Sequence, residues 1–257
     1  MIMKQWIILI CGILMVHVLV AQDASLRMKE ANEFFQKKKY EQAIQQYSKL
    51  LDEGYQSEAL YFNLGNAFFR SNQIGKAILN YERALLVAPN DAEIKHNLRV
   101  AYQSQKNQIE PLPAFFLAQW WNNLRMGLSS TAWAIIAIML VYLGVLGFMV
   151  WLRAPRRKTK KIGFVAGFTL LLISALPFSL AYSRAAYEID PAIGIVLQNE
   201  IALHTAPDDS SKSILTLYEG VKIHLLDQIG DWYKVQLENG EQGWLLQGSF
   251  EHVGLKS

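Results

Sequence analysis

Residues 131–183 read TAWAIIAIMLVYLGVLGFMVWL, then RAPRRKTKK, then IGFVAGFTLLLISALPFSLAYS. Residues 131–152 and 162–183 are two runs of 22 residues without a charge, and residues 153–161 between them hold six basic side chains. A helix of that length rises roughly 33 Å, which matches a hydrocarbon layer of about 30 Å. Buried helices of soluble proteins rarely stay uncharged on every face for so long. The stretch therefore predicts two transmembrane helices joined by a short basic loop.

The basic loop, residues 153–161, also predicts how the chain is oriented in a membrane. Short loops rich in Lys and Arg stay on the cytoplasmic side, so the regions before and after the hairpin should both lie on the opposite side. Residues 1–21 agree with this orientation, because Lys4 precedes an apolar run that ends before the small residue Ala21. That pattern is typical of a signal peptide. An uncleaved anchor is the alternative, and it would export the same regions.

Charge and cysteine content argue against several functional classes. The net charge is only +3 over 257 residues, and neither region outside the hairpin has the basic surface of a nucleic-acid-binding domain. Cys11, within residues 1–21, is the only cysteine, so we expect neither a disulfide nor a catalytic thiol in the exported regions. No acidic partner stands at a catalytic spacing from the four remaining histidines, His96, His204, His224 and His252. Metal-ligand clusters and phosphate-binding loops are also missing from the sequence. We therefore expect no enzyme, no metal, no cofactor and no nucleic-acid partner.

The region before the hairpin repeats itself with a period of 34 residues. A shift of 34 aligns Phe34 with Phe68, Ala43 with Ala77, Tyr47 with Tyr81 and Asn32 with Asn66. Small and aromatic residues at this period resemble tetratricopeptide repeats, which are pairs of antiparallel helices. The resemblance implies a domain over 22–108, with repeats at 24–57 and 58–91. Residues 92–106 then form either the first helix of a third repeat or a capping helix.

The resemblance also implies a concave groove that binds segments of partner proteins. The groove positions fall on Met28, Asn32, Phe35, Phe62, Asn63, Asn66 and Phe69. The alternative is that these aromatic side chains only pack between repeats. Family members that capture a carboxylate use Lys and Arg where this chain has Met28, Glu93 and Asn97. An apolar or amide-rich segment is therefore the predicted ligand.

Residues 109–130 connect the repeats to the membrane and are rich in aromatic side chains. Pro111 and Pro113 should end the preceding helix. The next residues predict an aromatic linker whose helix lies in the interface on the exported side of the membrane: Phe115, Phe116, Trp120 and Trp121. The alternative is an aromatic face for a partner protein.

After Pro191 the sequence changes to short apolar runs separated by turns. About six short strands in 190–257, with a tight-turn signal at Asn239-Gly240, predict a small closed barrel. The segments HTAPDDSSKSILTLYEG, GDWYKVQL and NGEQGWL resemble bacterial SH3 domains. Such domains often bind cell-wall peptides or proteins, so the resemblance implies a ligand face at Trp232, Tyr233 and Trp244. The alternative is that the two tryptophans belong to the core.

The sequence as a whole predicts a multidomain membrane protein: an all-α tetratricopeptide repeat domain, two transmembrane helices and a small all-β SH3-like barrel. This order resembles the BatE-type proteins of the Bat aerotolerance operon. The resemblance implies a multi-pass protein of the bacterial inner membrane, with both soluble domains periplasmic and residues 153–161 cytoplasmic. It also implies membrane-anchored von Willebrand-type partners in an envelope stress or export complex.

Two functions remain open from the sequence. The first is a scaffold whose repeat groove binds envelope or membrane proteins. The second is a receptor whose barrel binds the cell wall and reports across the bilayer. Residues 153–161 are too few to house a cytoplasmic output module, which favours the scaffold.

Overall fold

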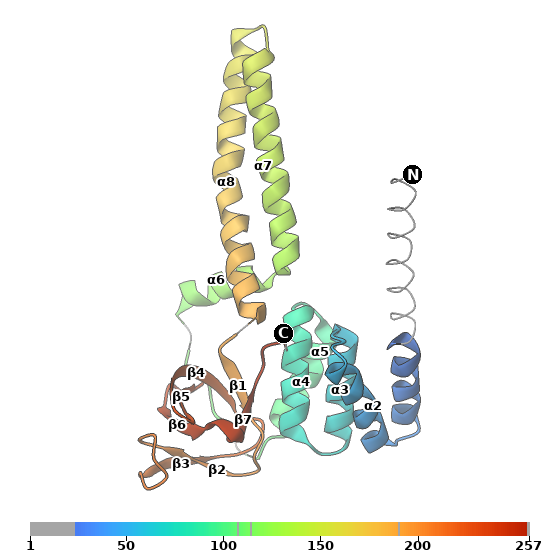
Figure 1. Ribbon diagram of the computed structural model, residues 1–257. Coiled ribbons are helices and arrows are strands. Elements are labelled where there is room, and N and C mark those ends of the chain that lie inside the picture. Colours follow the sequence, from blue (N-terminus) through green and yellow to red (C-terminus); the bar gives the residue numbers. More distant parts are fainter. Residues whose placement is uncertain (1–23, 107, 114, 190, 256–257) are drawn as a thin grey trace, which may run out of the picture.

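The computed structural model describes residues 24–106, 108–113, 115–189 and 191–255, so the predicted signal peptide lies outside the described residues. Helices at the N-terminal end and an antiparallel sheet at the C-terminal end lie side by side (Figure 1). A long helical hairpin projects away from both. The chain therefore divides into a soluble body and a hairpin that leaves it.

The N-terminal helices follow one another as packed antiparallel pairs. A helix over 24–36 precedes α2 (Tyr40–Asp52), and α3 (Glu58–Arg70) packs on α4 (Ile74–Val87), which also packs on α5 (Ala92–Gln103). Lys38 and Asn72 stand 34 residues apart in the turns between helices, with φ of 59° and 60°. The same turn therefore recurs at the period of the sequence repeat.

The hairpin consists of α7 (Ser130–Arg153) and α8 (Arg157–Ile189), and α6 (Phe116–Met126) lies across its base (Figure 1). Both α7 and α8 are long and apolar enough to cross a membrane. In the most apolar 18-residue stretch of each helix, only 11% and 28% respectively is buried. Such exposure is unlike the core helix of a soluble protein. The hairpin is consistent with membrane association.

Glycines allow α7 and α8 to pack backbone against backbone. A Cβ added at Gly147 would lie 2.8 Å from the backbone nitrogen of Gly167, and one added at Gly163 would lie 2.8 Å from the carbonyl oxygen of Gly147. Small residues at helix contacts are the usual way in which transmembrane helices approach closely. The two helices therefore pack closely along this seam.

The C-terminal region forms one seven-stranded antiparallel sheet with the order β3-β2-β6-β5-β4-β1-β7. The strands are β1 (Ile193–Val196), β2 (Ile201–His204), β3 (Ser213–Leu217), β4 (Lys222–Ile229), β5 (Trp232–Leu237), β6 (Gln242–Leu246) and β7 (Phe250–His252). Alternate residues such as Leu203, Val235 and Leu245 are fully buried in its core. The sheet is the SH3-like barrel that the sequence predicts, and it is called the barrel below.

The helical domain and the barrel share one hydrophobic core. Ile193, Ile195 and Val253 of the barrel region are buried in the same cluster as the helix residues Ile78 and Leu86. Polar contacts surround this apolar contact. Arg83 of α4 donates to Glu251 at 2.7 Å and to the backbone oxygen of His252 at 2.8 Å, and the backbone nitrogen of Gly75 donates to Glu219 at 3.0 Å. The two soluble domains therefore form one packed body.

A buried ion pair also joins the two domains. Lys222 of β4 donates to Glu82 of α4 at 2.8 Å, and the hydroxyl of Tyr102 in α5 donates to the same carboxylate at 2.7 Å. Burial alone raises the pKa of Glu82, but the charge and hydrogen bond of Lys222 and the hydrogen bond of Tyr102 outweigh it and leave the pKa lowered. Glu82 is therefore held ionised at the domain interface.

The soluble body is also fixed to the hairpin. Arg184 of α8 is 0% exposed and donates to the backbone oxygen of Leu86 at 2.8 Å. It pairs with Glu188 at 2.9 Å, and Glu188 accepts from the backbone nitrogen of Ser130 at 3.2 Å. The last turns of α8 are thus tied both to the end of α4 and to the start of α7.

Candidate functional site

The predicted groove residues lie on the first helices of the repeats and are half-buried. Each of the predicted positions is partly accessible: Met28, Asn32, Phe35, Phe62, Asn63, Asn66 and Phe69. Within this set, Asn32 and Asn66 stand at equivalent places in the two repeats. Their hydrogen bonds show how the surface is built.

Each of these two asparagines holds a tyrosine and a second asparagine. The side-chain oxygen of Asn66 accepts from the hydroxyl of Tyr81 at 2.7 Å and from the amide of Asn97 at 3.0 Å. In the preceding repeat, Asn32 accepts from Tyr47 at 2.5 Å and from Asn63 at 3.1 Å. The two arrangements match residue for residue with the 34-residue period. The side-chain oxygens of both asparagines are therefore used inside the fold, and their amide nitrogens make no hydrogen bond within the described residues.

The tyrosines of this arrangement stay protonated. Burial raises the pKa of Tyr47 to about 12 and raises the pKa of Tyr81 as well. A neutral hydroxyl can donate the hydrogen bond that orients the asparagine oxygen. The orientation of each asparagine therefore persists over the whole physiological pH range.

A cavity of about 340 Å³ lies on this face between α3 and α5. Its lining consists of Phe35, Asn66, Phe69, Arg70, Tyr81, His96, Asn97 and Val100. The volume falls within the range of roughly 300–1,000 Å³ for small-ligand sites and can hold an apolar side chain. Aromatic walls with amide groups at the edge suit an extended peptide segment.

The structure brings three of the predicted groove residues, Phe35, Asn66 and Phe69, into this cavity. Met28, Asn32, Phe62 and Asn63 do not line it. Phe62 instead packs against the ring of Tyr81 with centroids 5.9 Å apart. This placement agrees with the alternative in which an aromatic side chain supports the repeats.

Of the residues that α5 contributes to the cavity, sequence reasoning named Asn97 only as a departure from carboxylate-binding family members and missed His96 and Val100. Asn97 follows Asn66 by 31 residues, just as Asn63 follows Asn32, so the spacing was available as a signal. Arg70 and His96 also line the cavity, and no acidic residue does. Neither side chain has a periodic counterpart that could have identified it.

The predicted barrel residues divide between the two faces of the sheet. Tyr233 points toward the core and packs against Phe250 with ring centroids 5.2 Å apart. Trp232 and Trp244 are half-exposed and belong to neither buried cluster of the described residues. The ring of Trp232 contacts that of His204 edge-on at 5.4 Å, and His204 is the strand partner of Trp244. The two tryptophans and His204 therefore share the outer face of the sheet.

Within the described ranges, no group of three or more His, Cys, Asp or Glu residues is placed to hold a metal ion. On the outer face of the barrel, the hydroxyl of Ser211 lies 3.3 Å from Nδ1 of His204 and also donates to the backbone oxygen of Ala206 at 3.1 Å, so it belongs to the turn after β2. What this face and the cavity between α3 and α5 both offer is aromatic area with amide or imidazole groups. Such surfaces suit binding.

Comparison with protein families agrees with these two assignments. Residues 31–71 match the TPR repeat model, residues 58–91 match the tetratricopeptide repeat model, and residues 199–251 match the bacterial SH3 domain model. No curated protein matched the chain. The matches confirm the predicted fold class, and both types of domain are typically non-catalytic interaction domains. The chain thus joins tetratricopeptide repeats and a bacterial SH3 domain to two helices that are able to cross a membrane.

Proposed function

We propose that the chain is a non-enzymatic, membrane-anchored scaffold whose exported repeat groove binds a segment of a partner protein in a Bat-type envelope complex. The cavity between α3 and α5 carries this proposal. It presents the aromatic rings of Phe35 and Phe69 beside the free amide nitrogen of Asn66. An extended segment can place an apolar side chain in the cavity and accept a hydrogen bond through its backbone oxygen.

The proposal includes an orientation in the membrane. Residues 153–161 are assigned to the cytoplasm, and the helical domain and barrel to the periplasm. The support is the six basic residues of 153–161, which lie at the end of α7, in the turn and at the start of α8, against net −6 for the chain from Arg184 to the end. The signal peptide assigned to residues 1–21 belongs to the same proposal.

A crosslinking experiment tests the groove. We expect a photo-reactive residue in place of Phe69 to crosslink to one partner in intact cells, and one in place of the exposed Leu26 to leave that partner unlabelled. Val100→Lys places a charge in the cavity and should reduce the crosslink about 10-fold, which corresponds to about 1.4 kcal/mol. Val87→Lys is the matched control, because Val87 is 40% exposed and lies outside the cavity lining. Equal crosslinking in the two lysine variants would refute the groove.

A second candidate function is binding of the cell wall by the barrel. The observation that favours it is the outer-face placement of Trp232 and Trp244 beside His204. The full chain should then sediment with wall sacculi, and Trp232→Ala together with Trp244→Ala should abolish sedimentation. Sedimentation that survives both substitutions would remove this function from the aromatic face.

A further inference from the structure

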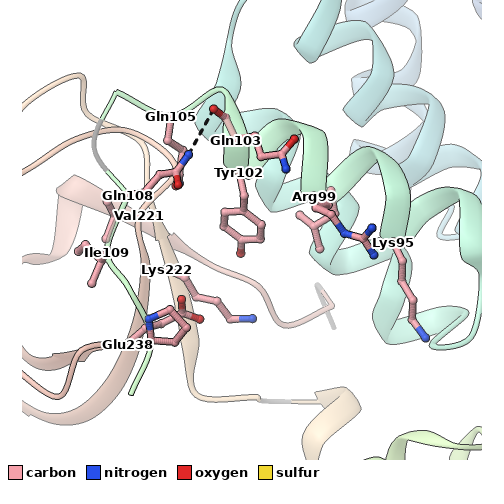
Figure 2. A pocket seen from close by; sticks show the side chains of 12 residues that line it. Lys95, Arg99, Tyr102, Gln103, Gln105, Gln108, Ile109, Val221, Lys222 and Glu238 are labelled. Atoms are coloured by element: carbon pink, nitrogen blue, oxygen red, sulfur yellow. Dashed lines mark hydrogen bonds between the residues drawn. The ribbon is translucent and has the colours of Figure 1, made fainter. Parts of the chain in front are cut away.

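A second cavity, of about 450 Å³, lies where α5, the barrel and the connector between α5 and α6 (residues 104–115) meet (Figure 2). Leu98 of α5, Ile109 and Pro111 of the connector, and Val221 beside β4 form its apolar part. The volume is ample for a small ligand. This cavity is separate from the repeat groove, since the two share no lining residue.

The helix side of the cavity carries two cations. Lys95 and Arg99 stand one turn apart on α5, and both side chains are exposed. Neither takes part in an ion pair or a side-chain hydrogen bond within the described parts of the chain. Figure 2 shows both on the helix side, across the cavity from the barrel. This end of the cavity is therefore free to receive an anionic group.

The barrel side carries a carboxylate. Glu238 is half-buried, and its carboxylate makes no hydrogen bond or ion pair with the residues that the structure describes. Its backbone oxygen accepts from the nitrogen of Leu112 at 2.9 Å, which fixes the residue against the connector. Burial raises the pKa of Glu238, although the charge of Lys222 acts in the opposite direction. A cationic group beside Glu238 would offset the cost of burying this charge.

The groups between these two ends are already satisfied. Tyr102 and Lys222 both donate to Glu82, so the wall between the ends has its charges matched. Figure 2 shows Tyr102 and Lys222 between Glu238 on one side and Arg99 on the other. Unmatched charge of opposite sign is thus left only at the two ends.

One polar group of the lining lacks a partner. The side-chain nitrogen of Gln105 is buried without a hydrogen-bond partner among the described residues. This nitrogen is shielded from solvent and lies against Gly220, so it is not open to a ligand and the charges at the two ends carry the recognition.

We propose that this cavity binds a short peptide by both of its ends. The ammonium group pairs with Glu238, the terminal carboxylate pairs with Arg99 and Lys95, and an apolar side chain contacts Leu98 and Ile109. A single amino acid is too short, because its two charged groups sit on one carbon while the cavity places its charges on opposite sides. An extended chain gains roughly 3.3–3.6 Å per residue, so a short peptide can separate its two charged ends as a single amino acid cannot.

Binding would have a structural consequence, because the lining comes from three parts of the chain. A peptide held between Arg99 of α5 and Glu238 of the barrel bridges the helical domain and the barrel. Since the ligand binds only the assembled interface, it should raise the temperature at which the soluble body unfolds. The repeat groove plays no part in this effect.

Calorimetry on the full chain in detergent micelles tests the proposal with the tripeptide Ala-Leu-Ala. We expect the unmodified tripeptide to bind, and acetylation of its amine or amidation of its carboxyl group to weaken binding about 10-fold each. In Glu238→Gln, acetylation should cease to matter while amidation still weakens binding. In the double variant Lys95→Gln with Arg99→Gln, the reverse should hold, because both partners of the carboxylate are then removed.

Matched controls separate this result from a general loss of structure. Glu200→Gln and Lys49→Gln change exposed residues outside both cavities and should leave all three affinities unchanged. The proposal is overturned if the unmodified tripeptide binds no tighter than about 10 mM, or if blocking its ends has no effect. It is also overturned if Glu238→Gln weakens the free and acetylated tripeptides by the same factor, because the carboxylate then has only a structural role.

Discussion

Gly65 of α3 lies in close contact with α4, the second helix of its repeat. A Cβ at this position would lie 2.7 Å from Cε1 of Tyr81 and 3.3 Å from the carbonyl oxygen of Ala77. The ring of Tyr81 is buried, and its hydroxyl is fixed on Asn66. A change at Gly65 therefore reaches the groove through a single side chain.

Gly65→Ala should destabilise the protein by about 1–3 kcal/mol, because the added methyl group overpacks a buried contact. It should also weaken partner binding, since displacing Tyr81 releases Asn66. Thermal unfolding followed by circular dichroism measures the first effect. Gly248→Ala is the control, because no heavy atom lies within 4 Å of a Cβ added there. Equal unfolding temperatures for the two variants would contradict the close contact.

At the level of single residues, the sequence predicted positions better than it predicted partners. The 34-residue period located Asn32 and Asn66, but it could not show that their oxygens accept from Tyr47 and Tyr81. Periodicity places a residue on a face of a helix, whereas a hydrogen bond depends on side-chain rotamers. The faces of β5, by contrast, follow from alternation alone, because the inward Val235 and Leu237 place Tyr233 on the inner face and Trp232 on the outer one.

The helices α7 and α8 pack so closely that their backbones are in contact. Their glycine seam leaves no room for a side chain at Gly147 or Gly167. The aromatic helix α6 contrasts with this seam, since none of its residues is buried, and Phe116 and Trp120 are 68% and 59% exposed. This exposure accords with the predicted interfacial position of α6, in which the apolar side is buried at the boundary between lipid headgroups and acyl chains.

The orientation of the hairpin can be tested through its turn. A fusion of green fluorescent protein within residues 153–161 should fluoresce, and a fusion of alkaline phosphatase at the same point should be inactive. The physical reason is that the six basic residues of this segment resist transfer across the membrane. Fusions after residue 255 should give the opposite pair of results. An active phosphatase at the turn would reverse the proposed orientation.

On the scale of the whole molecule, the main finding is that the helical domain and the barrel are packed together. Their interface includes Glu82 and Lys222, which are 140 residues apart in the chain. Contacts at such separation follow from how complete domains fit, and they have no periodicity or motif in the sequence. The family motifs predicted each domain, but nothing in them predicted this shared core.

Lys222→Met should lower the stability of the soluble body by about 3–5 kcal/mol, because it leaves the carboxylate of Glu82 buried without its ion-pair partner. The double variant Glu82→Leu with Lys222→Met should recover most of the loss, since it removes both charges. Urea unfolding followed by tryptophan fluorescence measures these differences. A double variant as unstable as the single one would show that the unpaired charge of Glu82 is not the cause of the lost stability.

The pair of Glu82 and Lys222 also makes the stability of the domain interface depend on pH. The pKa of Glu82 is lowered on balance, so its contribution is complete above the unfolded pKa of about 4.3 and is lost as the pH falls through the folded value. The pKa of Lys222 is raised: burial lowers it, but Glu82 outweighs burial. Its contribution is complete below about pH 10.4 and is lost as the pH rises through the folded value. Unfolding of wild type should therefore depend on pH in acid more steeply than unfolding of the double variant.

The attachment of α8 to the soluble body also determines which partners the protein can meet. This helix has 33 residues and is about 50 Å long, so it continues past a hydrocarbon layer of about 30 Å into the body, where Arg184 and Glu188 hold it. In the proposed membrane orientation, this attachment keeps the groove at a constant height above the lipid surface. A partner anchored in the same bilayer finds it by lateral diffusion, at an effective concentration that its own tether length determines. A segment that fits the groove but hangs from too short a tether stays unbound.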